Sequence, residues 1–456
     1  MRDLTEGSIT RHLAGMAGFI AVGLIVQTLY FLIDLYFVSR LGSDAIAGVS
    51  AAGNSFFLVL GLSQVVAIGS LALIAQAVGR KDPADARLVF NQAMGMGLAA
   101  AALTLVLGYG LAGAAMGGLG ASPGAAAAGR AYLFAFLPSL AITFPMAAVG
   151  AALRACGVVR PTMLAQTGSV ILNAVLAPVL IAGWGTGVPL GVAGAGLASS
   201  ISVAIAFAAL LVIFPRVQDM IRVTGAELKP RLAVWRRIVV IGLPAAGEFL
   251  MLFIVVSVVF WVIRGFGPQA QAGFGVGSRV MQAIFVPAMA VAFAAAPIAG
   301  QNFGAGKAGR VRRTFRDAAV ISCGVMLALT LLCQWNPRAL VAPFTSDAAA
   351  AAVAAGYLGM ISWNFVGNGL VFVCSAMFQA LGDTRPAFLS AATRMASFVL
   401  PALWLAGRPN VTLEDFWRLS LLSITLQAVV SLVFLRLVFR RKLDAGESIA
   451  PAPAAA

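Results

Sequence analysis

The sequence has little charge for its length. Asp, Glu, Lys and Arg make up only 10% of its 456 residues, whereas 61% are hydrophobic and the mean hydropathy is +0.96. Ordinary globular domains carry about 25% charged residues, so this chain could not cover a water-exposed surface. A membrane protein needs no such cover, because lipid solvates its exterior. We therefore expect an all-α integral membrane protein.

Histidine and clustered cysteine are also scarce. His12 is the single histidine, and the four cysteines are scattered without a CxxC pair, which argues against a zinc centre and against histidine-based catalysis. A Walker motif is absent too, because Lys307 in a glycine-rich segment is followed by Ala308 rather than by serine or threonine. We expect no enzyme activity, no cofactor, no dedicated metal centre and no use of ATP.

Apolar runs between charged or glycine- and proline-rich breaks predict twelve membrane-spanning helices. Each crossing needs about 20 residues, so twelve fit into this chain with short loops and no large soluble domain. The runs lie at 13–39, 46–78, 89–117, 130–153, 161–183, 192–214, 238–264, 271–301, 314–333, 352–380, 387–406 and 417–439.

The excess of positive charge, +15 overall, has a topological explanation. In a soluble protein it would favour nucleic acid as a partner. Here the connections alternate, with 23 Lys and Arg in one set and 6 in the other. The positive-inside rule then predicts that both termini lie in the cytoplasm. We expect the membrane to be a bacterial-type plasma (inner) membrane. We expect no nucleic-acid partner, and attraction of anionic lipids to the inner face is a secondary interpretation.

An internal repeat divides the chain in two. LGSDAIAG at 41–48 aligns with FGPQAQAG at 266–273, and RACGVVRP at 154–161 aligns with QALGDTRP at 379–386. The two segments of each pair are equally far apart in the sequence, by the number of residues that separates Leu41 from Phe266. We call this separation the repeat spacing. Six spans in each half make the repeat parallel, so we expect two six-helix lobes. The predicted divisions are an N-terminal lobe at 1–214, a cytoplasmic linker at 215–237, a C-terminal lobe at 238–440 and a disordered cytoplasmic tail at 441–456.

Apart from Asp317, at the start of its span, only Asp34 and Glu248 are acids inside the apolar spans. A charge in the membrane is costly, so each indicates a functional group. Desolvation favours the neutral acid and so allows proton uptake, whereas a nearby Na+ favours the carboxylate. Glu248 shares the C-terminal lobe with Arg394, and two interpretations stay open. In the first, the role is structural, with Glu248 fixed in an ion pair with Arg394 or with Arg394 capped by backbone carbonyls. In the second, Glu248 serves as a counter-ion for a substrate cation or as a second protonation site.

Polar and aromatic side chains within the spans are candidates for a substrate cavity. Small-molecule sites combine apolar walls with a few polar contacts, although any one such residue could equally join two helices by a hydrogen bond. The candidates are Gln27, Tyr30, Asn54, Glu248, Gln282, Trp363, Asn364, Asn368 and Arg394.

Several segments resemble the MATE (multidrug and toxic compound extrusion) transporters. IDLYFVSRLGSDAIAGVS at 33–50 is similar to the end of that family's first span, and ALRACGVVRPTM, GLPAAGE, PIAGQNFGAGK and QALGDTRP are similar to its other recurrent segments. The resemblance implies export of organic compounds, often cationic or aromatic, in exchange for H+ or Na+ by alternating access. Small-molecule drugs and membrane lipids are then the expected partners, and we expect a monomer.

The same resemblance assigns the cation-coupling residues. It puts the family's coupling aspartate at Asp34 and adds Tyr132 and Asn173 to that polar network. If the coupling ion were Na+, it would bind at Asp34 and Asn173, because hard cations prefer oxygen ligands.

This sequence departs from the family's Na+-coupled members at three positions. Ala177 occupies the position at which the archaeal-type network has a second acid. Leu252 and Leu370 occupy the positions at which NorM-like members have acids. These departures favour H+ coupling and a chain closer to DinF-like members than to NorM-like ones. The alternatives are a lipid-linked oligosaccharide flippase of the same superfamily, which would need a strongly basic cavity, and a major-facilitator-type transporter, whose DRxGRR pattern is missing from RKDPADAR at 80–87.

Overall fold

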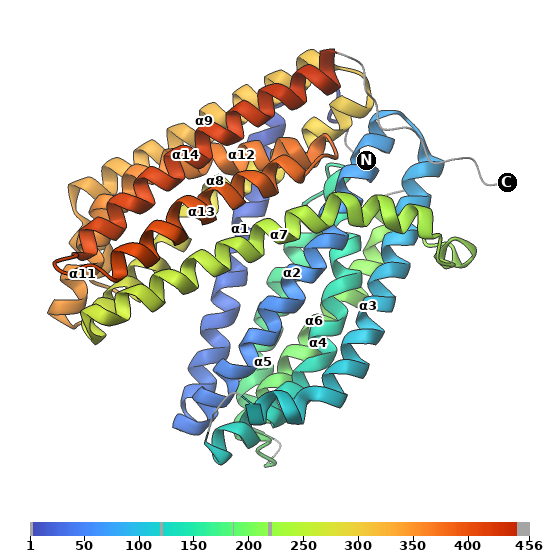
Figure 1. Ribbon diagram of the computed structural model, residues 1–456. Helices are drawn as coiled ribbons and strands as arrows, with labels where there is room; N and C mark the ends of the chain where they lie inside the picture. The colour runs from blue at the N-terminus through green and yellow to red at the C-terminus, as the bar shows by residue number, and fades with distance from the viewer. Residues whose placement is uncertain (1–2, 119–121, 186, 218–220, 445–456) are drawn as a thin grey trace. The chain divides into compact units, whose positions relative to one another are not determined.

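A computed structural model describes residues 3–118, 122–185, 187–217 and 221–444, except the side chains of 30–32, 34–35, 54, 57 and 114–118. Within these ranges the chain is helical, with no strand (Figure 1). Twelve described segments are long and apolar enough to cross a membrane, as predicted. They are α1 (Ile9–Ser39), α2 (Ser43–Gly79), α3 (Pro83–Gly118), α4 (Pro123–Ala155), α5 (Arg160–Ala182), α6 (Gly191–Val217), α7 (Leu232–Ile263), α8 (Pro268–Gly304), α9 (Ala308–Trp335), α11 (Ala348–Ile361) with α12 (Phe365–Ala380), α13 (Arg385–Ala406) and α14 (Leu413–Phe439).

Local sequence explains where many of these helices begin. Proline occupies the first turn of α4, α5, α8 and α13, where its missing N–H costs no hydrogen bond. At the start of α14, Thr412 and Asp415 form a capping box. The short elements between the spans are η1 (Gly225–Leu228), η2 (Arg264–Phe266), α10 (Pro337–Val341), η3 (Ser362–Asn364) and the π-helical η4 (Arg440–Asp444).

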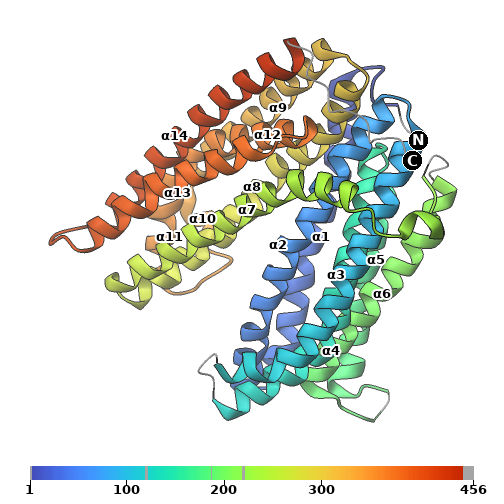
Figure 2. The same cartoon turned by 45° about the vertical axis from the view of Figure 1, so that its right-hand side comes forward.

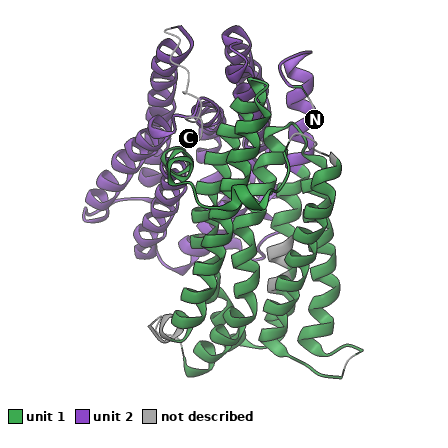
Figure 3. Cartoon of the chain, turned by 90° about the vertical axis from the view of Figure 1, so that its right-hand side faces the viewer, with its two compact units in different colours: residues 1–3, 22–242, 451–456 green, residues 4–21, 243–450 purple. Residues whose placement is uncertain are grey.

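The helices form two compact units (Figure 3). The main segment of unit 1 is 22–242, whereas unit 2 contains 4–21 and 243–444 of the described residues. The division therefore falls inside α1 and inside α7, so the first part of each helix belongs to a different unit from the rest. Residues 445–456 of the predicted tail lie outside the described residues.

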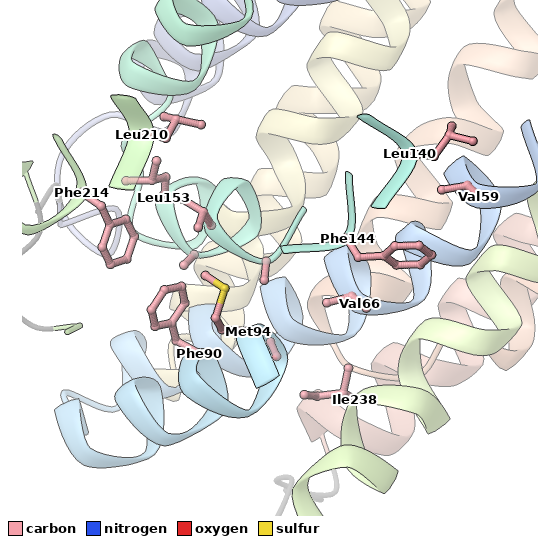
Figure 4. Close-up of a cluster of buried hydrophobic side chains, with 14 of the residues drawn as sticks. Val59, Val66, Phe90, Met94, Leu140, Phe144, Leu153, Leu210, Phe214 and Ile238 are labelled. Carbon is pink, nitrogen blue, oxygen red and sulfur yellow. The ribbon is translucent and has the colours of Figure 1, made fainter. Parts of the chain in front are cut away.

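Buried apolar side chains explain why the start of α7 belongs to unit 1. Ile238 of α7 is fully buried in the same cluster as Val66 of α2 and Phe144 of α4 (Figure 4). In that cluster the rings of Phe90 and Phe214 stack with their centroids 4.8 Å apart. The core of unit 1 thus continues across the linker into α7.

The segments that precede α1 and α7 are both anchored by side-chain amides. In unit 2, Asn302 donates from Nδ2 to the carbonyl oxygen of Leu4 at 3.1 Å. In unit 1, the backbone N–H of Arg231 donates to Oε1 of Gln92 at 2.7 Å. Satisfying buried backbone groups in this way fixes where each helix enters its bundle.

The repeat is visible in the packing of equivalent glycines. A Cβ built on Gly48 would lie 2.5 Å from the carbonyl oxygen of Ala125, and one built on Gly273 would lie 2.7 Å from that of Ala350. The two glycines are separated by the repeat spacing, and so are the two alanines. Small residues at such points let membrane helices approach closely, and both units use them at the same place.

We expect Gly48→Ala and Gly273→Ala each to destabilise the protein by about 1–3 kcal/mol, because the added methyl group overlaps backbone atoms. Gly53→Ala is the control, since a Cβ there would meet nothing within 4 Å. Thermal unfolding of the three variants in one detergent measures the difference. Equal unfolding temperatures for all three would contradict the close packing described above.

Candidate functional site

The side chains of Asp34, Tyr30 and Asn54 lie outside the described residues. The backbone of Asp34 and Tyr30 lies in α1, and that of Asn54 lies in α2. Gln27, one turn before Tyr30 on α1, is half-buried. The predicted coupling role of Asp34 therefore rests on its sequence context, and the described geometry concerns the other candidates.

Asn173 is a fully buried amide in unit 1. Its Nδ2 donates to Oγ of Ser199, from α5 to α6, at 3.2 Å, while its Oδ1 has no hydrogen-bond partner among the described residues. A buried acceptor without a partner is costly in free energy. This oxygen is therefore suited to accept a hydrogen bond from a proton donor or to coordinate a hard cation. Tyr132 of α4 is buried in the same unit and stacks on Phe136, with ring centroids 5.1 Å apart.

Glu248 contacts a neutral partner in unit 2. Oγ of Ser375, on α12, donates to Oε1 of Glu248, on α7, at 2.7 Å. Among the salt bridges of the described residues, none joins Glu248 to Arg394. Of the two open interpretations, the fixed ion pair is therefore not the arrangement found. Among the described residues, no cation lies within ion-pair distance of this carboxylate.

Arg394 lies on α13 in unit 2, and Tyr357 lies on α11 of the same unit. Tyr357 is buried in an aromatic cluster, with ring centroids 4.7 Å from Trp417 and 5.2 Å from Phe274. Nε of Arg394 has no hydrogen-bond partner in the described part of the chain. Sequence reasoning missed Tyr357, although the repeat contained the signal, because Tyr357 follows Tyr132 at the repeat spacing.

The remaining candidates divide into two groups. Asn364 and Asn368 are buried, and Nδ2 of Asn368 donates to the backbone oxygen of Asn364 at 3.1 Å. Nδ2 of Asn364 has no partner among the described residues. Trp363 and Gln282 are exposed. The structure thus brings the two asparagines together and leaves the other two side chains on the surface of unit 2.

Comparisons with known proteins find relatives that match most of the chain. A family model described as MatE matches residues 20–179 and 244–405. The multidrug export protein MepA of Staphylococcus aureus is 24% identical over 430 residues, which are 94% of each chain. A protein of the same name from Staphylococcus saprophyticus is 23% identical over 422 residues, 91% of each chain.

Solved structures show the same fold. A MOP superfamily transporter from Pyrococcus furiosus is 22% identical with a TM-score of 0.87, and a MATE protein in a bent conformation is 21% identical with a TM-score of 0.90. Both alignments cover 97% of this chain and 98% of the other. Because the sequence identities are below 25%, these two structures show a likeness of fold alone, which includes the two repeated lobes.

Proposed function

Since the chain belongs to the MATE family, whose model matches both of its halves, we propose that this integral membrane protein is a secondary-active multidrug efflux antiporter. It exports organic compounds, often cationic or aromatic, in exchange for H+ or Na+ by alternating access. The observation that carries the proposal is the position of the two matched segments, which begin at 20 and 244, close to the repeat spacing. Paired lobes of this kind are the usual basis of alternating access.

Asp34 is the coupling residue in this proposal, and Tyr132 and Asn173 belong to its network. The unpaired Oδ1 of Asn173 supports this assignment, because it can accept a hydrogen bond from a protonated acid or ligate Na+. Substrate and cation need not touch, since each only has to bias the same two-state equilibrium. The hydrocarbon side chain of Ala177 favours H+ and a DinF-like assignment.

Glu248 provides a negative charge for cationic substrates in unit 2. Its neutral partner Ser375 leaves the charge uncompensated, and an organic cation would supply the missing positive charge. The similarity to MepA, which is named a multidrug export protein, supports small-molecule drugs as the substrate class. The alternation of basic connections supports an inner-membrane protein with both termini in the cytoplasm, and we propose that it acts as a monomer.

The coupling ion can be identified in sealed liposomes that hold the protein with its cytoplasmic side outward. We expect an acidic interior to drive a fluorescent organic cation into the liposomes, because protons leaving the lumen then exchange for substrate. A Na+ gradient at equal pH is expected to drive little uptake, and a protonophore should abolish the proton-driven signal. Uptake driven by neither gradient would contradict antiport.

A further inference from the structure

A basic pocket of about 440 Å³ lies between α9 and α14 in unit 2. The two helices run alongside each other in two views of the molecule (Figures 1 and 2). The charged residues of the pocket are Arg312, Arg436, Arg440 and Asp444. We call this the α9–α14 pocket. It lies at the Arg440–Asp444 end of the last apolar span, Leu413–Asp444.

The other wall of the α9–α14 pocket is apolar. The rings of Phe315 and Phe439 meet edge to face, with centroids 6.0 Å apart. Leu432, two turns before Phe439 on α14, also lines the pocket and is 37% exposed. The pocket therefore combines arginine side chains at the end of a span with an apolar surface that continues along the outside of that span.

The charges in the α9–α14 pocket do not balance. Arg312 pairs with Asp444, but no carboxylate in the described part of the chain pairs with Arg436 or Arg440. Among the described residues, two guanidinium groups thus remain without a carboxylate partner beside an apolar groove. Guanidinium groups bind phosphate strongly through paired, charge-assisted hydrogen bonds.

The repeat shows that the fold does not require arginines at these positions. At the repeat spacing, Phe90 and Phe214 of unit 1 correspond to Phe315 and Phe439, and they stack closely and are buried. Leu211 and Pro215 stand at the positions that correspond to Arg436 and Arg440.

The third arginine of the pocket, Arg312, also differs from its counterpart in unit 1 in its ion-pair partner. Arg87, the counterpart of Arg312, pairs with Glu227 of the linker. Unit 1 thus has a leucine and a proline beside its phenylalanine pair, whereas unit 2 has two arginines there.

We propose that the α9–α14 pocket binds the headgroup of an anionic phospholipid. Its phosphate lies between Arg436 and Arg440, and one acyl chain follows Leu432 along α14. A lipid fits better than a soluble phosphate because the arginines stand at the end of a membrane span beside an exposed apolar groove. Basic pockets between membrane helices on the cytoplasmic side bind anionic lipid headgroups in this way. Placement in the inner leaflet rests on the orientation proposed above.

The test measures binding of a fluorescent phosphatidylglycerol to the purified full-length protein in detergent. Arg436→Gln/Arg440→Gln is expected to weaken binding roughly tenfold or more, since each arginine contributes about 1 kcal/mol. The matched control is Arg313→Gln/Arg316→Gln, which removes two exposed arginines of α9 that do not line the pocket. Asp444→Asn is expected to strengthen binding several-fold, because it frees Arg312 and removes the negative charge among the described residues that line the pocket.

Competitors distinguish the sources of phosphate. Unlabelled phosphatidylglycerol should displace the probe, whereas phosphatidylcholine and glycerol phosphate should displace it poorly. Equal competition by either of them, an equal loss in the control variant, or weaker binding by Asp444→Asn would overturn the proposal. Because the assay involves no transport, its failure is separable from a failure of antiport.

Discussion

Asp34→Asn is expected to abolish gradient-driven export of organic cations while the protein still folds and inserts. Asparagine has nearly the same shape as aspartate but cannot gain or lose a proton, so the cation gradient loses its means of biasing the two lobes. Coupling between two sites usually changes the affinity for one ligand by about 5–150-fold when the other ligand binds. We expect the Asp34→Asn protein to lose this effect of the cation on substrate affinity completely. Accumulation against a gradient in sealed vesicles measures the effect.

The matched control for Asp34→Asn is Asp44→Asn, the same chemical change in the same unit. Asp44 is exposed in the first turn of α2 and accepts a hydrogen bond from Ser122 Oγ at 2.9 Å. We expect this control to transport nearly as well as the unmodified protein. An Asp34→Asn protein that still exports substrate against a gradient, with its ion dependence intact, would rule out Asp34 as the coupling residue.

Glu248→Gln is expected to raise the KM for organic cations by about 10–100-fold and to change the KM for uncharged aromatic substrates little. The expectation follows from the partner of Glu248, which is the hydroxyl of Ser375 rather than a cation. Removing one partner of a buried charge pair typically costs about 2–5 kcal/mol, and part of this is regained because glutamine still accepts the hydrogen bond. Initial transport rates over a range of substrate concentrations give both KM values.

Ser375→Ala separates charge from hydrogen bonding at this position. It removes the hydroxyl that donates to Glu248 but leaves the carboxylate, so the preference for cations should survive. If Ser375→Ala and Glu248→Gln lowered the transport of cationic and neutral substrates alike, the role of Glu248 would be structural rather than electrostatic.

Much of the fold was predictable because its signals are local. Long apolar runs marked the twelve spans, and the repeat appeared in short motifs such as those at 41–48 and 266–273. The split of α1 and α7 between two units was not predictable. Hydropathy indicates that a helix lies in a membrane. When apolar residues occur on all sides of the helix, however, the sequence does not indicate which neighbouring helices it packs against.

The candidate site was predictable only in part, for a similar reason. The cost of a charge in lipid singles out Glu248 and Arg394 in the sequence, but their spacing along the chain does not say whether they meet. They belong to different helices, and Glu248 accepts its hydrogen bond from Ser375 rather than from Arg394. Ser375 comes from a third helix, α12, so only tertiary packing determines this pair.

The central claim, that substrate export and cation entry are coupled, is tested most directly by running the exchange in reverse. A substrate gradient is imposed across sealed proteoliposomes at equal pH and equal Na+ on the two sides, and lumenal pH is recorded. The account predicts that substrate flow moves protons in the opposite direction, and that Asp34→Asn stops this proton movement. Substrate flow that moves neither H+ nor Na+ would contradict it.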